Sequence, residues 1–202
     1  MAGEPPIVAF DFDGTMTVED SFSAFLKWRA GPAGWWRGLV RLIPAGIAYL
    51  VHRDRGRIKA EAVREFLRGV PRAALEAEAE RFAAERFDSL MRPDAVAAFR
   101  QWRGEAVRLL IVTASPSVVV APFARRLGAD DVVGTLLAYD GEGRVTGPFE
   151  GPNCRGPEKV VRLRQAYGDQ LRLLAAYGDT GGDTEMLAIA DAPYYRVFKG
   201  RP

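Results

Sequence analysis

Apolar residues in this chain gather in a few short, continuous runs separated by longer stretches with helical periodicity. A continuous apolar run is typical of a strand that is covered on both faces of a parallel sheet. We predict such strands at Ile7 to Phe10, Val107 to Val112, Val132 to Tyr139 with a break at Gly134, Leu173 to Tyr177, and Tyr194 to Phe198.

Helical patterns alternate with the later apolar runs. They cover Ser117 to Leu127 and Pro157 to Tyr167, and a last one begins near Thr184. Strands that alternate with helices of this length predict a parallel α/β sheet.

A long block without strand patterns lies between the first two runs. Helical periodicity continues from Ser21 to about Gly104, with breaks at Gly31-Pro32, Pro44, Gly69 to Pro71, and Pro93. Because this block is too long for a crossover connection, we predict an all-helical cap at residues 21–91. The cap would be inserted into a core made of residues 1–20 and 92–202.

The first apolar run ends in two aspartates, Asp11 and Asp13, just before the chain turns at Gly14. In an extended chain residues i and i+2 project to the same side, so both carboxylates would lie at the strand's carboxyl end. Open α/β sheets bind their ligands there. An Asx-type turn is the alternative, since Asp and Gly are common turn residues. Adjacent carboxylates repel each other, and a divalent cation with oxygen ligands is the usual remedy.

A second acidic cluster follows the run that ends at Tyr177. The segment GDTGGD places Asp179 and Asp183 around a turn with two glycines, so both carboxylates can face the crevice of Asp11 and Asp13. Four carboxylates at the ends of two strands predict a Mg²⁺ site.

Two further segments carry candidate phosphate-binding groups. Thr113 and Ser115 end the second apolar run, where hydroxyl and N–H groups can hold a phosphate oxygen, although such hydroxyls often serve only as helix caps. Lys159 is one of four lysines among 28 basic residues, and its compact ammonium suits a phosphoryl group or a carboxylate. An exposed lysine in the first turn of a helix is the alternative.

The composition restricts the chemistry further. With one cysteine, Cys154, and one histidine, His52, the chain can form neither an internal disulfide nor a zinc cluster. A metal ion would therefore be held by oxygen atoms. The amino terminus has no secretory signal pattern, so we expect a cytoplasmic protein. A net charge of +2 argues against nucleic acid as a partner.

Basic residues are nevertheless concentrated in one region. Between Lys27 and Arg68 there are ten basic and three acidic residues, which fits a solvated basic face, a phosphorylated substrate or an anionic lipid surface. The apolar stretch Trp35 to Val51 lies in the same region and is too short to span a bilayer. It fits either a helix in the membrane interface or a buried helix of the cap.

In combination, DFDGT, a strand-end threonine, a lysine and GDxxxD resemble the haloacid dehalogenase (HAD) superfamily, with its Rossmann-like core, over nearly the whole chain. The resemblance implies that Asp11 is the nucleophile that forms an aspartyl-phosphate and that Asp13 is the general acid and base. An acid at position 13 implies phosphomonoester hydrolysis, because related transport ATPases and dehalogenases lack it. Mg²⁺ would be bound by Asp11, the Asp13 backbone carbonyl and Asp179, with Asp183 in support.

The resemblance also implies residues that bind the substrate. Thr113 and Lys159 would hold the transferring phosphoryl group. The helical insertion is similar to that of the phosphoserine phosphatase-like group, and Asp20 falls where that group has its substrate-contacting acid. If the substrate is a small soluble metabolite, cap arginines such as Arg57 or Arg64 would hold its carboxylate or another anionic group.

Short phrases around the motifs resemble the bacterial phosphatidylglycerophosphatase C type more closely. They are DSFxxFL at Asp20 to Leu26, GxEKV at Gly156 to Val160, and YGD followed by an Asp. This likeness implies a lipid phosphate substrate and peripheral contact with the inner face of the membrane. The alternatives are a soluble phosphatase for phosphoserine or phosphoethanolamine, a phosphotransferase, and a phosphate-sensing protein without catalysis.

Overall fold

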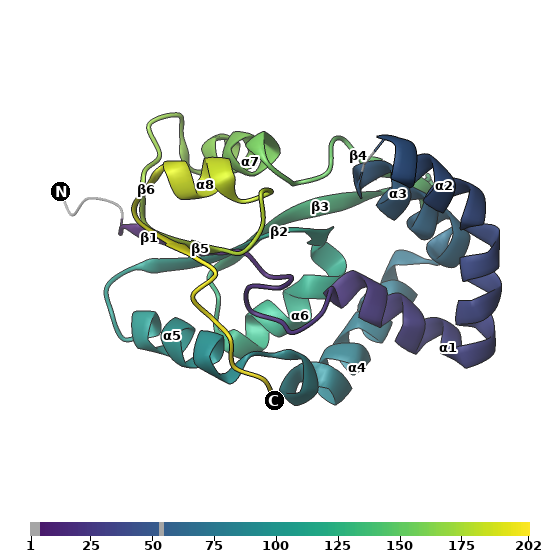
Figure 1. Cartoon of the computed structure of the whole chain (residues 1–202), viewed down its shortest axis with the longest axis horizontal. Helices are drawn as coiled ribbons and strands as arrows, with labels where there is room; N and C mark the ends of the chain where they lie inside the picture. Colours follow the sequence, from purple (N-terminus) through teal and green to yellow (C-terminus); the bar gives the residue numbers. More distant parts are fainter. Residues whose placement is uncertain (1–4, 53–54) are drawn as a thin grey trace.

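The computed structural model describes residues 5–52 and 55–202 of the chain. At its centre lies a six-stranded sheet with the strand order β4-β3-β2-β1-β5-β6 (Figure 1). The strands are β1 (Ile7–Phe10), β2 (Arg108–Pro116), β3 (Asp131–Tyr139), β4 (Val145–Glu150), β5 (Leu173–Gly178) and β6 (Ala190–Tyr195). All neighbours are parallel except β4, which is antiparallel to β3 at one edge. The prediction of a parallel α/β sheet is therefore confirmed.

Helices cover both faces of this sheet. On one face lie α5 (Pro93–Arg103) and α6 (Ser117–Leu127), and on the other α7 (Pro157–Tyr167) and α8 (Thr184–Ala188) (Figure 1). The alternating residues of β1 explain this arrangement, because successive side chains point to opposite faces. Phe10 packs in one core cluster with Phe99 of α5, whereas Ala9 belongs to a second cluster with Leu163 of α7 and Met186 of α8.

Four consecutive helices lie beyond the end of the sheet to which β1 and β2 run (Figure 1). They are α1 (Ser21–Arg41), α2 (Ile43–His52), α3 (Arg55–Leu67) and α4 (Arg72–Leu90). The expected break at Gly31 is a kink inside α1, where this glycine has a φ of 66°. The helical block was expected from the periodicity, while its assignment to a separate cap at residues 21–91 stays a prediction.

Two strands differ from the sequence prediction. The edge strand β4 was not predicted, because its Gly147 and Pro148 are residues that disfavour a central strand and are tolerated at an edge. The last strand was expected at Tyr194 to Phe198, whereas β6 covers Ala190–Tyr195 and pairs with β5 along its length. The segment of β6 contains Asp191 and Pro193, so its sequence shows no continuous apolar run, and Arg196, with a φ of 54°, follows its last residue.

Gly134 does not break β3, contrary to expectation. It pairs in register with Thr113 of β2, and a Cβ atom at this position would lie 2.6 Å from Ser117 Oγ. The glycine therefore permits close packing against the start of α6, and the strand continues through it. This packing fixes the end of β2, which carries two of the candidate site residues.

Candidate active site

The predicted acidic residues meet at the carboxyl ends of adjacent strands. Asp11 and Asp13 lie in the loop after β1, Asp179 directly follows β5, and Asp183 precedes α8. Thr113 lies near the end of β2 on the other side of β1. Because β2, β1 and β5 are neighbours in the sheet, residues about 170 positions apart come together at one edge.

Lys159 is the cation of this cluster. It lies in the first turn of α7, is 1% exposed, and its Nζ donates to Asp11 Oδ1 at 2.5 Å and to Asp183 Oδ1 at 2.6 Å. A third bond goes to the carbonyl oxygen of Val112 at 2.9 Å. Burial disfavours the charged ammonium, but the two carboxylates outweigh it and raise the pKa of Lys159. The alternative of an exposed surface lysine is therefore excluded.

The nucleophile candidate Asp11 is itself buried. Burial raises the pKa of this carboxyl to about 7, although the neighbouring Lys159 acts in the opposite direction. Its second oxygen, Oδ2, lies 3.0 Å from the hydroxyl of Thr15. Burial thus makes the ionised form of Asp11 unfavourable in free energy, and a further cation next to the carboxylate would stabilise that form.

Asp183 and Asp179 form the other half of the acidic cluster. Asp183 Oδ2 accepts bonds from the N–H of Asp179 at 3.2 Å and from the N–H and hydroxyl of Thr180 at 3.0 Å and 3.1 Å. Burial alone would raise the pKa of Asp183, yet Lys159 and the Thr180 bonds lower it. The pKa of Asp179 is raised by burial and by the adjacent Asp183.

Thr15 and Gly14 position Asp179 against the loop after β1. The Thr15 hydroxyl lies 3.2 Å from Asp179 Oδ1 and can donate its one proton either to this residue or to Asp11. Gly14 has a φ of 84°, and a Cβ atom there would lie 2.5 Å from Asp179 Oδ2. This glycine is therefore required both for the turn and for the close approach of the carboxylate.

Three of these carboxylates suit a divalent cation. Oxygen atoms of Asp11, Asp179 and Asp183 all lie within 4.8 Å of one another. Lys159 supplies one positive charge against three negative ones, so the group has an excess of buried negative charge. Hard oxygen donors with this charge fit Mg²⁺. Asp183 is 1% exposed and accepts hydrogen bonds on both oxygens, whereas Asp179 is only partly buried and Asp11 Oδ2 shares the single Thr15 hydroxyl with it, which makes Asp179 and Asp11 the more accessible donors.

Asp13 has a separate set of hydrogen bonds. Its Oδ1 accepts from the N–H of Ser21 at 2.7 Å, and its Oδ2 accepts from the hydroxyl of Ser115 at 2.5 Å. Thr113 Oγ1 lies 3.5 Å from the same Oδ2 and accepts the N–H of Ser115 at 3.0 Å. Both hydroxyl residues are fully buried and contact Asp13 directly.

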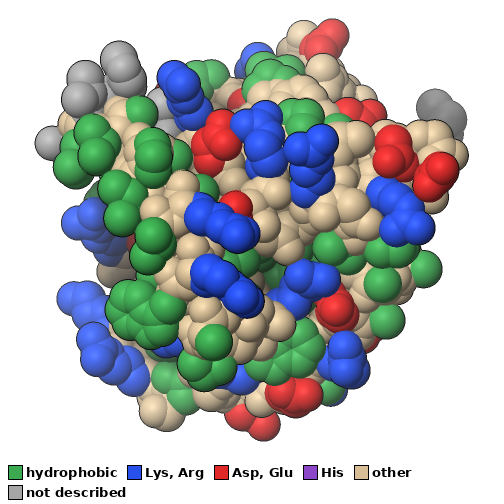
Figure 2. Space-filling view, turned by 90° about the vertical axis from the view of Figure 1, so that its right-hand side faces the viewer, with side chains coloured by type: hydrophobic (Ala, Val, Ile, Leu, Met, Phe, Trp, Pro, Cys, Tyr) green, Lys and Arg blue, Asp and Glu red, His purple; other side chains and the backbone are tan. Residues whose placement is uncertain are grey.

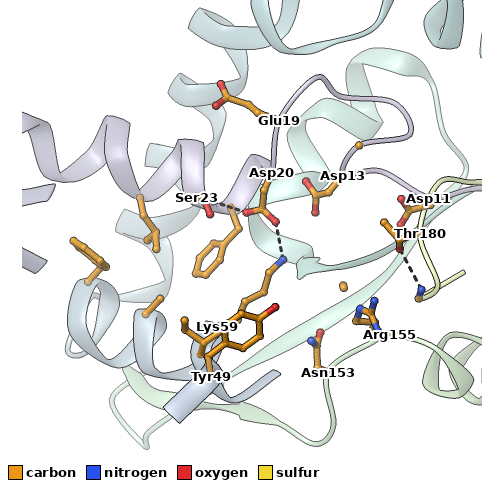
Figure 3. A pocket seen from close by; sticks show the side chains of 18 of the residues that line it. Asp11, Asp13, Glu19, Asp20, Ser23, Tyr49, Lys59, Asn153, Arg155 and Thr180 are labelled. Atoms are coloured by element: carbon orange, nitrogen blue, oxygen red, sulfur yellow. Dashed lines mark hydrogen bonds and ion pairs between the residues drawn. The ribbon is translucent and has the colours of Figure 1, made fainter. Parts of the chain in front are cut away.

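A cavity of about 530 Å³ opens in front of Asp11 and Asp13 (Figure 3). Polar groups near its base include Asn153, Arg155 and Thr180. Apolar side chains of the helical block line its other side: Phe22, Leu26, Trp35, Leu39, Leu42, Ile58, Ala62 and Phe66, with Tyr49 beside them. A ligand would therefore meet charged groups at one end and an apolar wall at the other.

Lys59 of α3 also lines the cavity, although no sequence motif marks it. Its Nζ lies 2.9 Å from Asp20 Oδ2 and donates to Ser115 Oγ at 3.2 Å, and Figure 3 shows it pointing toward Asp20. Burial would raise the pKa of Asp20, but Lys59 and the N–H of Ser23 lower it. Asp20 therefore lines the cavity, where it is paired with a cation, and its contact with substrate stays a prediction.

The structure does not bring Arg57 and Arg64 into this cavity. Both are exposed on α3, and Arg64 pairs with Glu61 at 2.7 Å. Residues seven apart share one helix face, which lies roughly opposite the face of Lys59 and Phe66. The helical period places these arginines away from the apolar face of α3, whereas Lys59 lies on the side that faces the cavity.

The architecture and this site define an α/β protein with an acidic centre at the carboxyl ends of its parallel strands. The family model of the haloacid dehalogenase-like hydrolases matches residues 8–188. The chain belongs to this family, as the motifs indicated.

Relatives and solved structures agree with this family. The chain is 58% identical to the protein CicA of Caulobacter vibrioides over 202 residues, all of this chain and 90% of that protein. A solved protein of unknown function from Bordetella pertussis Tohama I is 25% identical, with a TM-score of 0.80, over 95% of this chain and 89% of that one. The solved structure of a phospho-aspartyl intermediate analogue of phosphoserine phosphatase has a TM-score of 0.61 and is 18% identical, over 95% of this chain and 86% of that chain.

These matches refine the resemblance seen in the sequence. The fold extends to a phosphoserine phosphatase, as expected, while the proposed likeness to the phosphatidylglycerophosphatase C type finds no support in them. The described helices, which cover residues 21–52 and onward from 55, include none with the length and apolarity needed to cross a bilayer.

Proposed function

We propose that the protein is a Mg²⁺-dependent phosphatase that hydrolyses phosphomonoesters through an aspartyl-phosphate. One observation carries this proposal: Asp11 and Asp13 lie side by side at the base of the cavity with different partners. Asp11 is held by Lys159 and Thr15, and Asp13 by Ser21 and Ser115. Two carboxyl groups with different surroundings suit two different roles in one reaction.

In the first half of the reaction, an oxygen of Asp11 attacks phosphorus and the bond to the ester oxygen breaks. Asp13 donates its proton to that leaving oxygen, which departs as an alcohol. In the second half, Asp13, now a carboxylate, takes a proton from water, and the resulting hydroxide attacks phosphorus. Phosphate leaves, and the Asp11 carboxylate is restored.

Fixed charges around Asp11 would bind the phosphoryl group. The Lys159 ammonium, 2.5 Å from Asp11 Oδ1, is held in place by Asp183 and needs no reorganisation during the reaction. Asp11, Asp179 and the backbone carbonyl of Asp13 would hold Mg²⁺. The metal ion supplies positive charge that stabilises the phosphoryl oxygens. The buried Thr113 supports this arrangement through its contact with Asp13.

For the substrate, we propose a phosphomonoester with a large apolar group, that is, a lipid phosphate such as phosphatidylglycerol phosphate. The apolar wall of the cavity, formed by α1, α2 and α3, supports this choice. A small charged metabolite would leave this apolar surface in contact with water, whereas an acyl chain would bury it. A lipid phosphate is presented by a membrane, so this substrate also requires peripheral contact with the membrane surface.

A soluble metabolite phosphatase is the second candidate, and the pair of Asp20 and Lys59 favours it. These opposite charges lie within the cavity and are 2.9 Å apart. They match the ammonium and carboxylate groups of phosphoserine, or the ammonium of phosphoethanolamine. Replacement of Lys59 by Met would then raise KM for phosphoserine and have little effect on a lipid ester.

Phosphate release by the full chain with Mg²⁺ tests both candidates. The substrates are phosphatidylglycerol phosphate in mixed micelles, phosphoserine and phosphoethanolamine. Asp11→Asn is the blank because an amide is a poor nucleophile, and the exposed Asp169→Asn is its matched control. Preference for the lipid ester supports the first candidate, and preference for a soluble ester supports the second. Release that is equally fast in Asp11→Asn would contradict the proposed mechanism.

A further inference from the structure

Five large apolar side chains project from the outer side of α1 and α2. We call them the apolar ridge: Trp36, Val40, Ile43, Ile47 and Leu50. Each is between 55% and 71% exposed, and together they are half of the ten exposed large hydrophobic residues in the described part of the chain. Figure 2 shows hydrophobic side chains gathered on one side of the face formed by these helices. A concentration of this kind marks a contact surface.

The residue pattern explains why the ridge is exposed. Its members follow each other at intervals of four, three, four and three residues, which is the spacing of one helix face. A neighbouring side of the same helices is also apolar, because Trp35, Leu39 and Tyr49 line the cavity. The tandem tryptophans are divided between these sides: Trp35 stacks on Phe66 and Trp36 faces water.

Basic side chains accompany the ridge. Arg37 and Arg41 are exposed on α1, and together with Trp36, Val40 and Ala33 they line a shallow hollow of the surface. Figure 2 shows Lys and Arg side chains next to the hydrophobic cluster. Apolar groups flanked by arginines are complementary to a phospholipid surface, in which acyl chains lie beneath anionic phosphates.

We propose that the apolar ridge docks the protein on an anionic lipid bilayer, with α1 and α2 lying in the interface. A second copy of the chain fits this surface less well. In a symmetric dimer the same patch meets itself, so Arg37 and Arg41 of both copies would be brought close together, where like charges repel. A bilayer with anionic lipids instead offers phosphates to Arg37 and to Arg41, whose exposed guanidinium also pairs through Nη1 with Glu65 at 3.0 Å.

Docking through this surface would explain how a lipid substrate reaches the cavity, and this part of the proposal rests on the proposed function. The ridge lies on α1 and α2, and the same two helices carry part of the apolar wall of the cavity, so a docked protein would have that part of the wall next to the acyl chains. A lipid phosphate could then enter with its phosphate toward Asp11 while its apolar part stays against Leu39 and Leu42. The source of the substrate would be the bilayer itself.

Vesicle binding by the full chain tests the docking directly. The vesicles contain phosphatidylcholine alone or phosphatidylcholine with phosphatidylglycerol, and the bound fraction is measured by flotation. We expect binding only to the anionic vesicles, and the double variant Trp36→Ser/Ile47→Ser should weaken it on the order of tenfold or more. The matched control is Val161→Ser/Val197→Ser, which replaces two exposed apolar residues outside the ridge.

The arginines are tested in the same assay. Replacement of both Arg37 and Arg41 by Gln should weaken binding roughly fivefold for each charge removed. The exposed Arg172→Gln is the control and should bind like the unchanged protein. Equal binding to uncharged vesicles, or binding that none of the ridge variants weakens, would overturn the proposal. A soluble dimer that Trp36→Ser/Ile47→Ser dissociates would overturn it as well and assign the ridge to a second copy.

Binding and hydrolysis are measured separately, so their failures can be distinguished. Asp11→Asn should bind anionic vesicles like the unchanged protein while it releases no phosphate. The ridge variants should hydrolyse a soluble ester such as p-nitrophenyl phosphate at the unchanged rate, because no ridge residue lines the cavity. Loss of vesicle binding in Asp11→Asn would contradict docking through the ridge, whereas absence of hydrolysis in the unchanged protein would contradict only the proposed function.

Discussion

Lys159 and Asp11 form a buried ion pair in which Nζ and Oδ1 are 2.5 Å apart, and Asp183 accepts a bond from the same ammonium. The lysine comes from α7 and the aspartates from the loops after β1 and β5. One side chain therefore links three segments that are far apart in the sequence. It also keeps two carboxylates close together that would otherwise repel each other.

Replacement of Lys159 by Met should destabilise the protein by about 3–5 kcal/mol, because it leaves two buried carboxylates without their partner. Urea unfolding in the absence of Mg²⁺ measures this change in the free energy of unfolding. Lys199→Met is the matched control, since Lys199 is exposed and its loss should have little effect. If both variants unfold at the same urea concentration, the ion pair does not contribute to stability.

Asp13→Asn should slow the hydrolysis of an alkyl phosphate roughly a hundredfold or more, because a poor leaving group requires a proton donor. The loss should be much smaller for p-nitrophenyl phosphate, whose leaving group departs without a proton. The ratio of the two rates therefore separates acid catalysis from a general loss of structure. Equal losses with both esters would argue that Asp13 does not protonate the leaving oxygen.

Gly14→Ala should weaken Mg²⁺ binding about tenfold or more, since the added Cβ atom would displace Asp179 from its place. The positive φ of Gly14 adds a cost of about 1–2 kcal/mol in stability. Titration of phosphate release with Mg²⁺ measures the effect. Gly141→Ala is the control, because a Cβ atom there meets open space. An unchanged Mg²⁺ requirement would exclude Asp179 from the metal site.

Much of this arrangement could be predicted from the sequence, because the relevant signals are local. A continuous apolar run followed by Asp11 and Asp13 indicates both a central strand and a site at its end. The helices α6 and α7 begin and end where the periodicity placed them. The motif around Asp179 is equally local, since its glycines and acids lie within six residues.

Long-range pairings could not be predicted in the same way. The contact between Lys59 and Asp20 depends on how α3 packs against the start of α1, and no local pattern records it. The edge strand β4 depends on pairing with β3, which compensates for its glycine and proline. The charge of Arg64 made it a candidate for binding substrate, but the helix face that carries it points away from the cavity, where it pairs with Glu61.

Asp94 connects the carboxy-terminal segment to α5, and this contact predicts a pH dependence of stability. Its carboxylate accepts the N–H groups of Lys199 at 2.7 Å and Gly200 at 2.8 Å, and that of Ala95 at 3.0 Å. Burial would raise the pKa of Asp94, but these backbone bonds lower it below its ordinary value. The folded state therefore favours the ionised carboxylate.

Asp94→Ala should consequently lower the free energy of unfolding by about 1–2 kcal/mol at neutral pH, where the carboxylate is ionised. A group with a lowered pKa stabilises the fold above its unfolded pKa of about 4 and loses this contribution as the pH falls further. The difference between the variant and the unchanged protein should therefore shrink below about pH 4. Urea unfolding at several pH values measures it, with the exposed Asp169→Ala as control. A difference that stays constant down to strongly acidic pH would show that packing of the segment, and not the charge of Asp94, is responsible.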